Sequence, residues 1–310
     1  MMMPIIPPIL TSELEKELTR EKFVRVTNKG QNIIYDFAAN EAPLLMREVG
    51  RLRELTFRSA GGGTGLEVDI DEYDVSDHPY RQLIVWDPID KEILGGYRYI
   101  IGDKVKIGSN GVPELATTEM FHFSETFIKE YLPYTIELGR SFVQPQYQSS
   151  KAGAKALYAL DNLWDGLGAL VIENPSVKYF FGKVTMYTHF SRTARDLILS
   201  FMNKYFEDKE RLVYPYEPVQ IGLTENELKQ IFVGPDFVDD YKVLVKRVRD
   251  FGENIPPLVN AYMTLSPSMR SFGTAINTHF GDVEETGIII TIKELYKDKT
   301  DRHMNTYNRG

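Results

Sequence analysis

The stretch TIELGRSFVQPQYQ, residues 135–148, decides the fold prediction, because it reads as a strand that runs straight into a loop. It carries Glu137 and Arg140, three positions apart, in an otherwise apolar or small-residue run. In a regular strand such residues point to opposite faces of the sheet. A β-bulge adds one residue and would bring both charges to one face, and Gly139 is where a bulge is best tolerated. The sequence leaves both interpretations open.

Around this strand, helix patterns and strand patterns alternate along the chain. Residues 82–87 and 92–101 are strand-like runs joined by PIDK, a hairpin signal. Residues 40–59 place apolar side chains at helical spacing, with Asn40 as the expected cap. This mixture predicts an α/β (α+β) fold in which helices cover both faces of a mixed sheet. Further helices are predicted at 12–23, 151–170, 191–206 with Ser191 as cap, 224–232, 240–252 and after residue 254, and further strands at 177–186 and 286–295.

The chain is long enough for one large domain or two ordinary ones, with 310 residues. Its content of 43% apolar and 26% charged residues is that of a soluble globular protein with a sizeable core. No internal repeat, low-complexity block or linker divides it. We therefore predict one compact unit, made of an N-terminal tail and short helix (residues 1–24), a core (25–205) and a C-terminal extension packed on that core (206–310).

The charge and the missing cysteines exclude several classes of function. A net charge of −8 argues against nucleic acid as a partner. The absence of cysteine removes disulfides, thiolate nucleophiles and cysteine-based zinc sites, and it fits a cytoplasmic location. The start, MMMPIIPPIL, has no signal-peptide features, and no run approaches the length of a membrane span. We expect a packed or mobile tail, with weak contact at the inner membrane surface as the alternative.

Three other patterns are read as structural. GGGTG, residues 61–65, lacks the Lys-Ser/Thr of a phosphate loop and follows a helix, so a flexible loop beside a site is expected. EVDIDEYDVSD, residues 67–77, lacks the calcium-loop pattern, so we expect a solvated acidic turn with one or two carboxylates folded back onto arginines. The histidines have no metal-ligand spacing, and no Gly-x-Ser-x-Gly elbow occurs. Neither a metal nor a permanently bound cofactor is expected.

Several short motifs follow one another along the chain: RELTFR with Arg53 and Phe57, DEYD with Asp71 and Asp74, GGYR with Gly96 and Arg98, ELGRSFV with Glu137 and Arg140, and Leu163, Trp164 and Gly166. Together they resemble a known family, the hemolysin-like ornithine–acyl carrier protein N-acyltransferases of ornithine- and glycine-lipid synthesis. These enzymes are related to the GNAT fold and to acyl-homoserine-lactone synthases. The later segment IPPLVNAYM, residues 255–263, resembles a C-terminal part that the shorter autoinducer synthases lack.

This resemblance implies a GNAT-like, mostly antiparallel twisted sheet with a C-terminal elaboration. It implies transfer of a long-chain (3-hydroxy)acyl group from acyl carrier protein to the α-amine of ornithine or glycine. The segment QYQSSKAGAKAL, residues 146–157, departs from the usual pyrophosphate loop of coenzyme A-binding members, which favours carrier-bound acyl-phosphopantetheine over acyl-CoA. The alternatives are an autoinducer-synthase-like enzyme or N-acetyltransferase that uses acyl-CoA, and a non-catalytic acyl- or carrier-binding protein.

The resemblance also implies roles for individual residues. Glu137 is expected to bind or deprotonate the acceptor amine, beside a cleft in which pantetheine lies as an extra strand. An acidic carrier protein would dock on basic side chains at Lys151 and Lys155 or in the segment 242–249. The expected acceptor-binding residues are Arg140, Arg98, Arg53, Phe57, Asp71 and Asp74, and the expected donor-binding residues are Gly139, Ser141, Phe142, Val143, Lys151 and Gly153.

Overall fold

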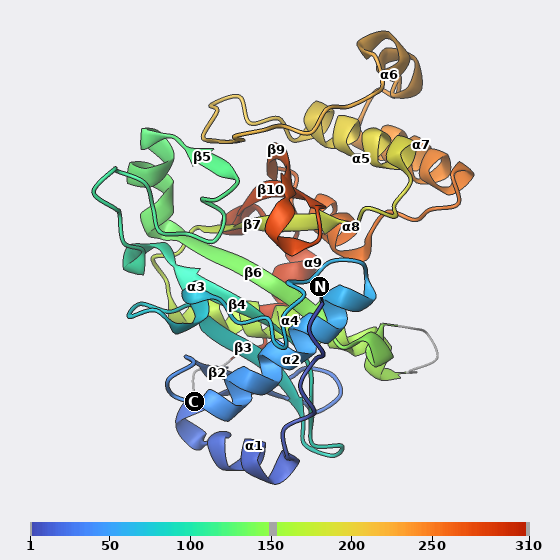
Figure 1. Cartoon of the computed structure of the whole chain (residues 1–310). Coiled ribbons are helices and arrows are strands. Elements are labelled where there is room, and N and C mark those ends of the chain that lie inside the picture. The colour runs from blue at the N-terminus through green and yellow to red at the C-terminus, as the bar shows by residue number, and fades with distance from the viewer. Residues whose placement is uncertain (1, 149–153, 308–310) are drawn as a thin grey trace.

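The computed structural model of the chain describes residues 2–148 and 154–307 and is organised around one large sheet. Neighbouring strands in this sheet are antiparallel except β6 and β7, which are parallel (Figure 1). The predicted mixed, mostly antiparallel sheet flanked by helices is therefore confirmed. In spatial order the eight strands are β1 (Phe23–Val26), β2 (Ile33–Phe37), β3 (Arg81–Asp87), β4 (Glu92–Ile101), β6 (Thr135–Val143), β7 (Tyr179–Met186), β10 (Val283–Thr291) and β9 (Arg270–Asn277). A separate two-stranded sheet pairs β5 (Phe121–Phe123) with β8 (Val213–Pro215).

The helices are mostly those that the sequence predicts, with one wrong cap. Helix α2 has Ala42 as its N-cap, without a side-chain hydrogen bond, so the prediction of Asn40 as cap is wrong. The carboxylate of Glu17 accepts from the backbone N–H groups of Leu44 (3.2 Å) and Leu45 (2.8 Å) instead. The helices are α1 (Thr11–Glu17), α2 (Pro43–Ser59), α3 (Glu72–Val75), α4 (Ala154–Glu173), α5 (Arg192–Tyr205), α6 (Glu225–Ile231), α7 (Phe237–Asp250), α8 (Pro257–Met263) and α9 (Lys297–His303).

The other local predictions have mixed outcomes. The hairpin of β3 and β4 is confirmed, as is Ser191 as the cap of α5, where its hydroxyl accepts from the N–H of Ala194. The helix predicted at 12–23 ends at Glu17 and is followed by a short 3₁₀ turn. Strands β1, β2 and β9 have no counterpart among the sequence predictions. The segment after α5 supplies both β9 and β10, and β10 pairs with β7 along its whole length.

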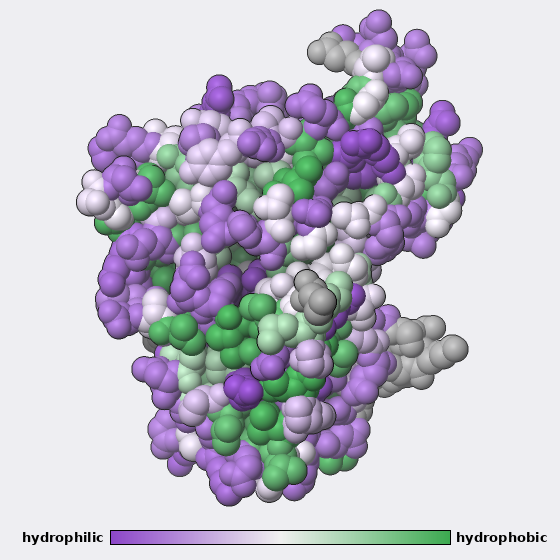
Figure 2. Space-filling model, viewed as in Figure 1, coloured by the Kyte–Doolittle hydropathy of each residue, from purple (hydrophilic) through white to green (hydrophobic). Residues whose placement is uncertain are grey.

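The N-terminal tail packs along the loop that follows α2. The N–H of Met3 donates to the carbonyl of Gly65 (2.8 Å), and the N–H of Ile6 donates to that of Glu67 (3.3 Å). Apolar side chains gather on the surface of this part of the molecule, as Figure 2 shows in green; exposed examples are Met2, Met3, Leu10 and Leu66. No helix in the described part of the chain is long and apolar enough to span a membrane. Contact with a membrane surface stays a prediction.

The two faces of the central sheet have different linings, because side chains alternate along each strand. On β6, Leu138 faces the core that contains α4 and α8, together with Phe180 of β7. The opposite face carries α2 and a second aromatic-rich core, which includes Phe181. Glu137 belongs to this second face, because it pairs with Phe181 in the parallel ladder and neighbouring residues in a sheet point the same way.

The central strands β6 and β7 separate after a short contact. Their parallel ladder runs from the pair Thr135–Tyr179 to the pair Leu138–Gly182 and then stops. Beyond this point β6 continues along β4, while β7 continues along β10 (Figure 1). The gap that opens between them lies next to Gly139, in the middle of the sheet. This gap positions the candidate site.

Candidate active site

A β-bulge in β6 lies at the point where the sheet opens. Gly139 pairs with Arg98 of β4 and Phe142 pairs with Gly96, so two residues of β6, Arg140 and Ser141, face one residue of β4. Of the two interpretations that the sequence left open, the structure therefore shows the bulge near Gly139. Arg140 takes the left-handed conformation, with a φ of 49°, which is uncommon for a residue other than glycine.

The bulge brings Glu137 and Arg140 to one cavity, which occupies the gap between β6 and β7. The cavity contains about 830 Å³ of space not filled by atoms, a figure that includes its open mouth. Its polar side lies on the α2 face of the sheet and its apolar side on the α4 and α8 face. The polar side is lined by Arg98, Thr117, Glu137, Arg140, Lys183, Thr185 and Glu285, and the apolar side by Tyr97, Leu138, Phe180, Leu258, Tyr262, Ile288 and Ile290.

Glu137 is a buried carboxylate held by two hydroxyl donors. Its side chain is 2% exposed, and its two oxygens accept from the hydroxyls of Tyr80 and of Thr117, the latter at 2.8 Å. Burial raises the pKa of Glu137 above its ordinary value, and the two hydrogen bonds offset only part of this effect. A carboxylate with a raised pKa accepts a proton more readily, as a general base must.

Tyr80 fixes the direction of this hydrogen bond. Its oxygen accepts from the backbone N–H of Ala116 at 3.0 Å, so its own proton points to Glu137. Burial and the neighbouring Glu137 charge hold the pKa of Tyr80 well above its ordinary value, which keeps this phenol protonated. Tyr80 thus serves as a fixed donor to the carboxylate.

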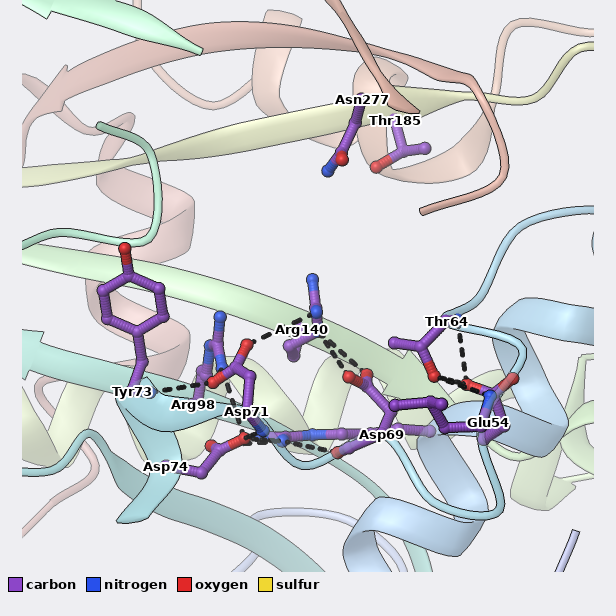
Figure 3. A network of polar contacts seen from close by, with 12 residues as sticks. Glu54, Thr64, Asp69, Asp71, Tyr73, Asp74, Arg98, Arg140, Thr185 and Asn277 are labelled. Carbon is purple, nitrogen blue, oxygen red and sulfur yellow. Dashed lines mark hydrogen bonds and ion pairs between the residues drawn. The ribbon is translucent and has the colours of Figure 1, made fainter. Parts of the chain in front are cut away.

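Next to Glu137, three arginines and three aspartates form one network (Figure 3). Asp74 binds Arg53 (3.1 Å) and Arg98 (3.2 Å). The closest contacts of the other two aspartates are between Asp71 and Arg98 (2.6 Å) and between Asp69 and Arg140 (2.8 Å). A longer contact between Arg140 and Asp71 (3.5 Å) joins the two halves. The network is neutral overall, which reduces the cost of burying its charges.

The network separates the predicted acceptor-binding residues into two groups. Arg98, Arg140 and Phe57 line the cavity, whereas Arg53 is fully buried outside it and is also bound to the side chain of Gln82. Although burial alone would raise it, the charges of Arg53 and Arg98 hold the pKa of Asp74 below its ordinary value. Asp74 and Asp71 act on the site through the arginines, since neither lines the cavity.

The predicted donor-binding residues are also divided. Gly139 and Ser141 line the cavity. Phe142 packs in the core beneath α2, and the partly buried Val143 packs against the opposite core. Lys151 and Gly153 lie outside the described residues.

Sequence reasoning missed several residues of the cavity. Tyr80 and Thr117 lie in segments without a motif. Asp69, which does not line the cavity but binds Arg140, was not singled out from its acidic run. Lys183 and Glu285 form an ion pair across β7 and β10 at 2.6 Å. Lys183 and Glu285 are charged residues within strands, as Glu137 is, and the same sequence signal could have identified them.

Two structural interpretations from the sequence can now be judged. In the loop GGGTG, the N–H of Thr64 (3.0 Å), its hydroxyl (2.8 Å) and the N–H of Gly65 (2.8 Å) all donate to the carboxylate of Glu54 (Figure 3). This internal carboxylate occupies the place that a phosphate would need. In the acidic run, carboxylates fold back onto arginines as predicted, with three of them involved instead of one or two. The prediction that this turn is solvated is wrong for Asp69 and Asp74, which are fully buried.

We expect Arg53 to be needed for stability. Replacing Arg53 by Met leaves Asp74 with one fewer buried partner, and breaking a buried ion pair costs about 3–5 kcal/mol. Urea denaturation should show this loss in the free energy of unfolding, while Arg47→Met, an exposed position of the same helix, should change it by about 0.5 kcal/mol or less. Equal unfolding midpoints for the two variants would contradict the structural role of Arg53.

A domain model and known relatives match this chain. A model of the acetyltransferase (GNAT) domain matches residues 52–158, from α2 to the start of α4. The glycine N(alpha)-acyltransferase of Bacteroides thetaiotaomicron is 58% identical over 303 residues, which cover 98% of this chain and 90% of that protein. The protein of the same name from Phocaeicola vulgatus is 57% identical over 303 residues, 98% and 93% of the two chains. No solved structure gives a significant match.

The relatives extend over β9 and β10 as well as over the matched domain, so the likeness includes both walls of the cavity. The predicted enzyme class, an N-acyltransferase with a GNAT domain, is confirmed. The finer assignment to an ornithine-specific, carrier-dependent branch has no support among these relatives. This chain belongs to the family of the glycine N(alpha)-acyltransferases.

Proposed function

We propose that the protein transfers a long acyl chain from a pantetheine thioester to the α-amine of glycine, as a step of amino-lipid synthesis. The observation that carries the proposal is the bulged strand β6, which places buried Glu137 at the polar side of a cavity whose other side is apolar. The names of the two relatives support glycine as acceptor. Ornithine, the other predicted acceptor, becomes a competitor in the test.

Aminolysis of a thioester needs few groups, and this cavity offers them. The amine nitrogen attacks the carbonyl carbon, the C–N bond forms, the C–S bond breaks, and the thiolate leaves and takes up a proton. Glu137 accepts the proton that the amine loses. Main-chain N–H groups of β6 between Gly139 and Phe142, beyond the end of the β7 ladder, are the proposed donors to the oxyanion.

The separation of β6 from β7 leaves space for an extended pantetheine thioester. Because the ladder between β6 and β7 ends at Leu138, the edge of β6 that follows can pair with a pantetheine arm as with an additional strand. The acyl chain would then pass through the gap to the apolar side of the cavity, between Phe180, Tyr262 and Ile288. This apolar side favours a long chain over an acetyl group, since burial of each additional methylene contributes about 0.8 kcal/mol.

Acyl carrier protein is the proposed source of the thioester. The segment after β6 lacks the pyrophosphate loop of coenzyme A-binding relatives. Exposed bases on α7, namely Lys246, Arg247 and Arg249, offer a docking surface for an acidic carrier, although the protein as a whole is acidic. Lys151 of the second predicted docking surface lies outside the described residues.

The function is tested by supplying different donors and acceptors to the purified protein. Acyl carrier proteins and coenzyme A carrying the same long acyl chain, and acetyl-CoA, are each combined with glycine or ornithine, and products are identified by mass spectrometry. We expect long-chain N-acylglycine, formed faster from the carrier protein. N-acetyl products alone or no product would contradict the proposal, and faster turnover of acyl-CoA would contradict the carrier assignment.

Replacing Glu137 by Gln is expected to lower kcat at least tenfold, about 1.4 kcal/mol in the barrier, because the amide cannot accept the amine proton. Since folding raises the pKa of Glu137, ionising it costs folding free energy at neutral pH. The neutral Gln avoids this cost, so the unfolding midpoint should not fall. An unchanged rate in a folded variant would show that Glu137 is not the base.

Replacing Tyr80 by Phe is expected to move the acid limb of the pH–rate profile upward. The Tyr80 hydroxyl lowers the pKa of Glu137, so its removal raises that pKa, and the base then ionises only at a higher pH. The profile of kcat/KM against pH measures the shift. Tyr73→Phe is the matched control, because the Tyr73 hydroxyl is not a hydrogen-bond donor to Glu137, and its profile should match that of the wild type. A downward or absent shift in Tyr80→Phe would contradict the assigned hydrogen bond.

A further inference from the structure

A buried ion pair in the cavity has no part in the chemistry described so far. Lys183 of β7 and Glu285 of β10 are 2.6 Å apart, with side chains 13% and 5% exposed. The carboxylate of Glu285 also accepts from the amide of Asn277 (3.2 Å) and the hydroxyl of Thr185 (3.4 Å). Figure 3 shows Asn277 and Thr185 on the far side of the gap, opposite Arg140. The partners of Glu285 thus fix a charged pair in the wall that β7 and β10 form.

The pair lies on the same face of the sheet as Glu137. Phe181 is the neighbour of Glu137 in the parallel ladder, and Lys183 follows Phe181 by two residues, which returns its side chain to that face. The positive charge of Lys183 is close enough to lower the pKa of Glu137. The catalytic carboxylate and this ammonium group therefore flank one small polar space.

The other cations of the cavity are already committed to protein carboxylates. Arg98 binds Asp71 and Asp74 and lies over the ring of Tyr80. Arg140 contacts Asp69 and Asp71 and stacks on Phe280, at 4.3 Å from the ring centre. Lys183 has one carboxylate partner within the described residues. An ammonium group has three donors, so it can bind a second anion without losing the first.

We infer that Lys183 binds the carboxylate of the acceptor amino acid, with Glu285 as the positioning residue that holds the ammonium group in the cavity. This inference rests on the proposed function. In an α-amino acid, one carbon separates the amine from the carboxylate, so base and cation must lie close together on one face, as Glu137 and Lys183 do. Amines without a carboxylate would miss this contact, which makes Lys183 a determinant of acceptor specificity.

Glu285 suits the positioning role because it remains ionised. Burial acts to raise its pKa, but the charge and hydrogen bond of Lys183, together with the charge of Arg140 and the hydrogen bond from Asn277, outweigh burial and keep this pKa below the ordinary value. The pair is thus neutral before the acceptor arrives. Thr185, directly opposite Glu285 in the ladder of β7 and β10, limits the movement of its carboxylate.

The test compares glycine with glycinamide, which has the amine but no carboxylate. The double variant Lys183→Met with Glu285→Gln removes both charges together, so no unpaired charge remains buried. We expect the preference for glycine, measured as the ratio of the two kcat/KM values with one acyl donor, to fall by about ten- to a hundredfold. The loss should lie in KM for glycine. Because Lys183 also lowers the pKa of Glu137, the two acceptors are compared at a pH above the acid limb of each variant's pH–rate profile.

Two further variants serve as controls. Lys204→Met with Asp240→Asn removes a Lys–Asp pair that is also 2.6 Å apart but lies on α5 and α7 outside the cavity, and it should leave the preference unchanged. Lys183→Arg keeps the charge and should keep most of the preference for glycine. If Lys183→Arg loses the preference for glycine as completely as the double variant does, Lys183 does not act by recognising the charge of the acceptor carboxylate.

The outcomes separate this inference from the proposed function. If the wild type acylates glycine and the folded double variant retains the preference, the role of Lys183 is overturned and the glycine function stands. If the wild type does not acylate glycine, the proposed function is overturned by that result alone, and the acceptor-carboxylate site is overturned with it. If the wild type acylates glycine and only the double variant loses the preference for glycine over glycinamide, the proposed function and the role of Lys183 are both supported.

Discussion

The site depends on one constraint, which is that β6 carries an additional residue where it faces Tyr97 of β4. The bulge places Arg140 in a left-handed conformation, where a side chain other than that of glycine is strained. Contacts of its guanidinium with Asp69, Asp71 and the ring of Phe280 hold it there. Because β6 changes direction at the bulge, it separates from β7, and the sheet opens beside Glu137. The polar cavity and the passage to the apolar side both follow from this turn.

The two walls of the opening come from distant parts of the chain and have different tasks. The first wall, built from α2, the acidic run and β4, uses three arginines and three aspartates to fix the bulge, so most of its charge is structural. The second wall, built from β7 and β10, carries a smaller charged pair that has spare donors. The C-terminal strands therefore complete the cavity itself, and the relatives, which match this part too, are similar over both walls.

The sequence predicted those features that depend on local chemistry. The hairpin of β3 and β4 follows from its turn residues. Glu137, Gly139 and Arg140 indicated the bulge as one of two interpretations, and only the pairing with β4 decided between them. The prediction of Asn40 as the cap of α2 was wrong, because the carboxylate of Glu17, far away in sequence, accepts the hydrogen bonds from the first N–H groups of the helix. Strand β9 was missed because RSFGTAIN has little alternation and a central glycine. The pairing of Lys183 with Glu285 depends on the register of β7 and β10, strands about a hundred residues apart, which composition and spacing do not encode.

In the proposed function the gap between β6 and β7 holds the acyl donor. A crystal structure of the protein with glycine and an unreactive thioether analogue of acyl-pantetheine tests this most directly. The pantetheine arm should lie along β6 after Leu138, with the carbonyl beside Glu137 and the acyl chain between Phe180 and Tyr262. Electron density for the analogue in the separate groove lined by His78, Lys104 and Lys106, with the gap empty, would contradict it.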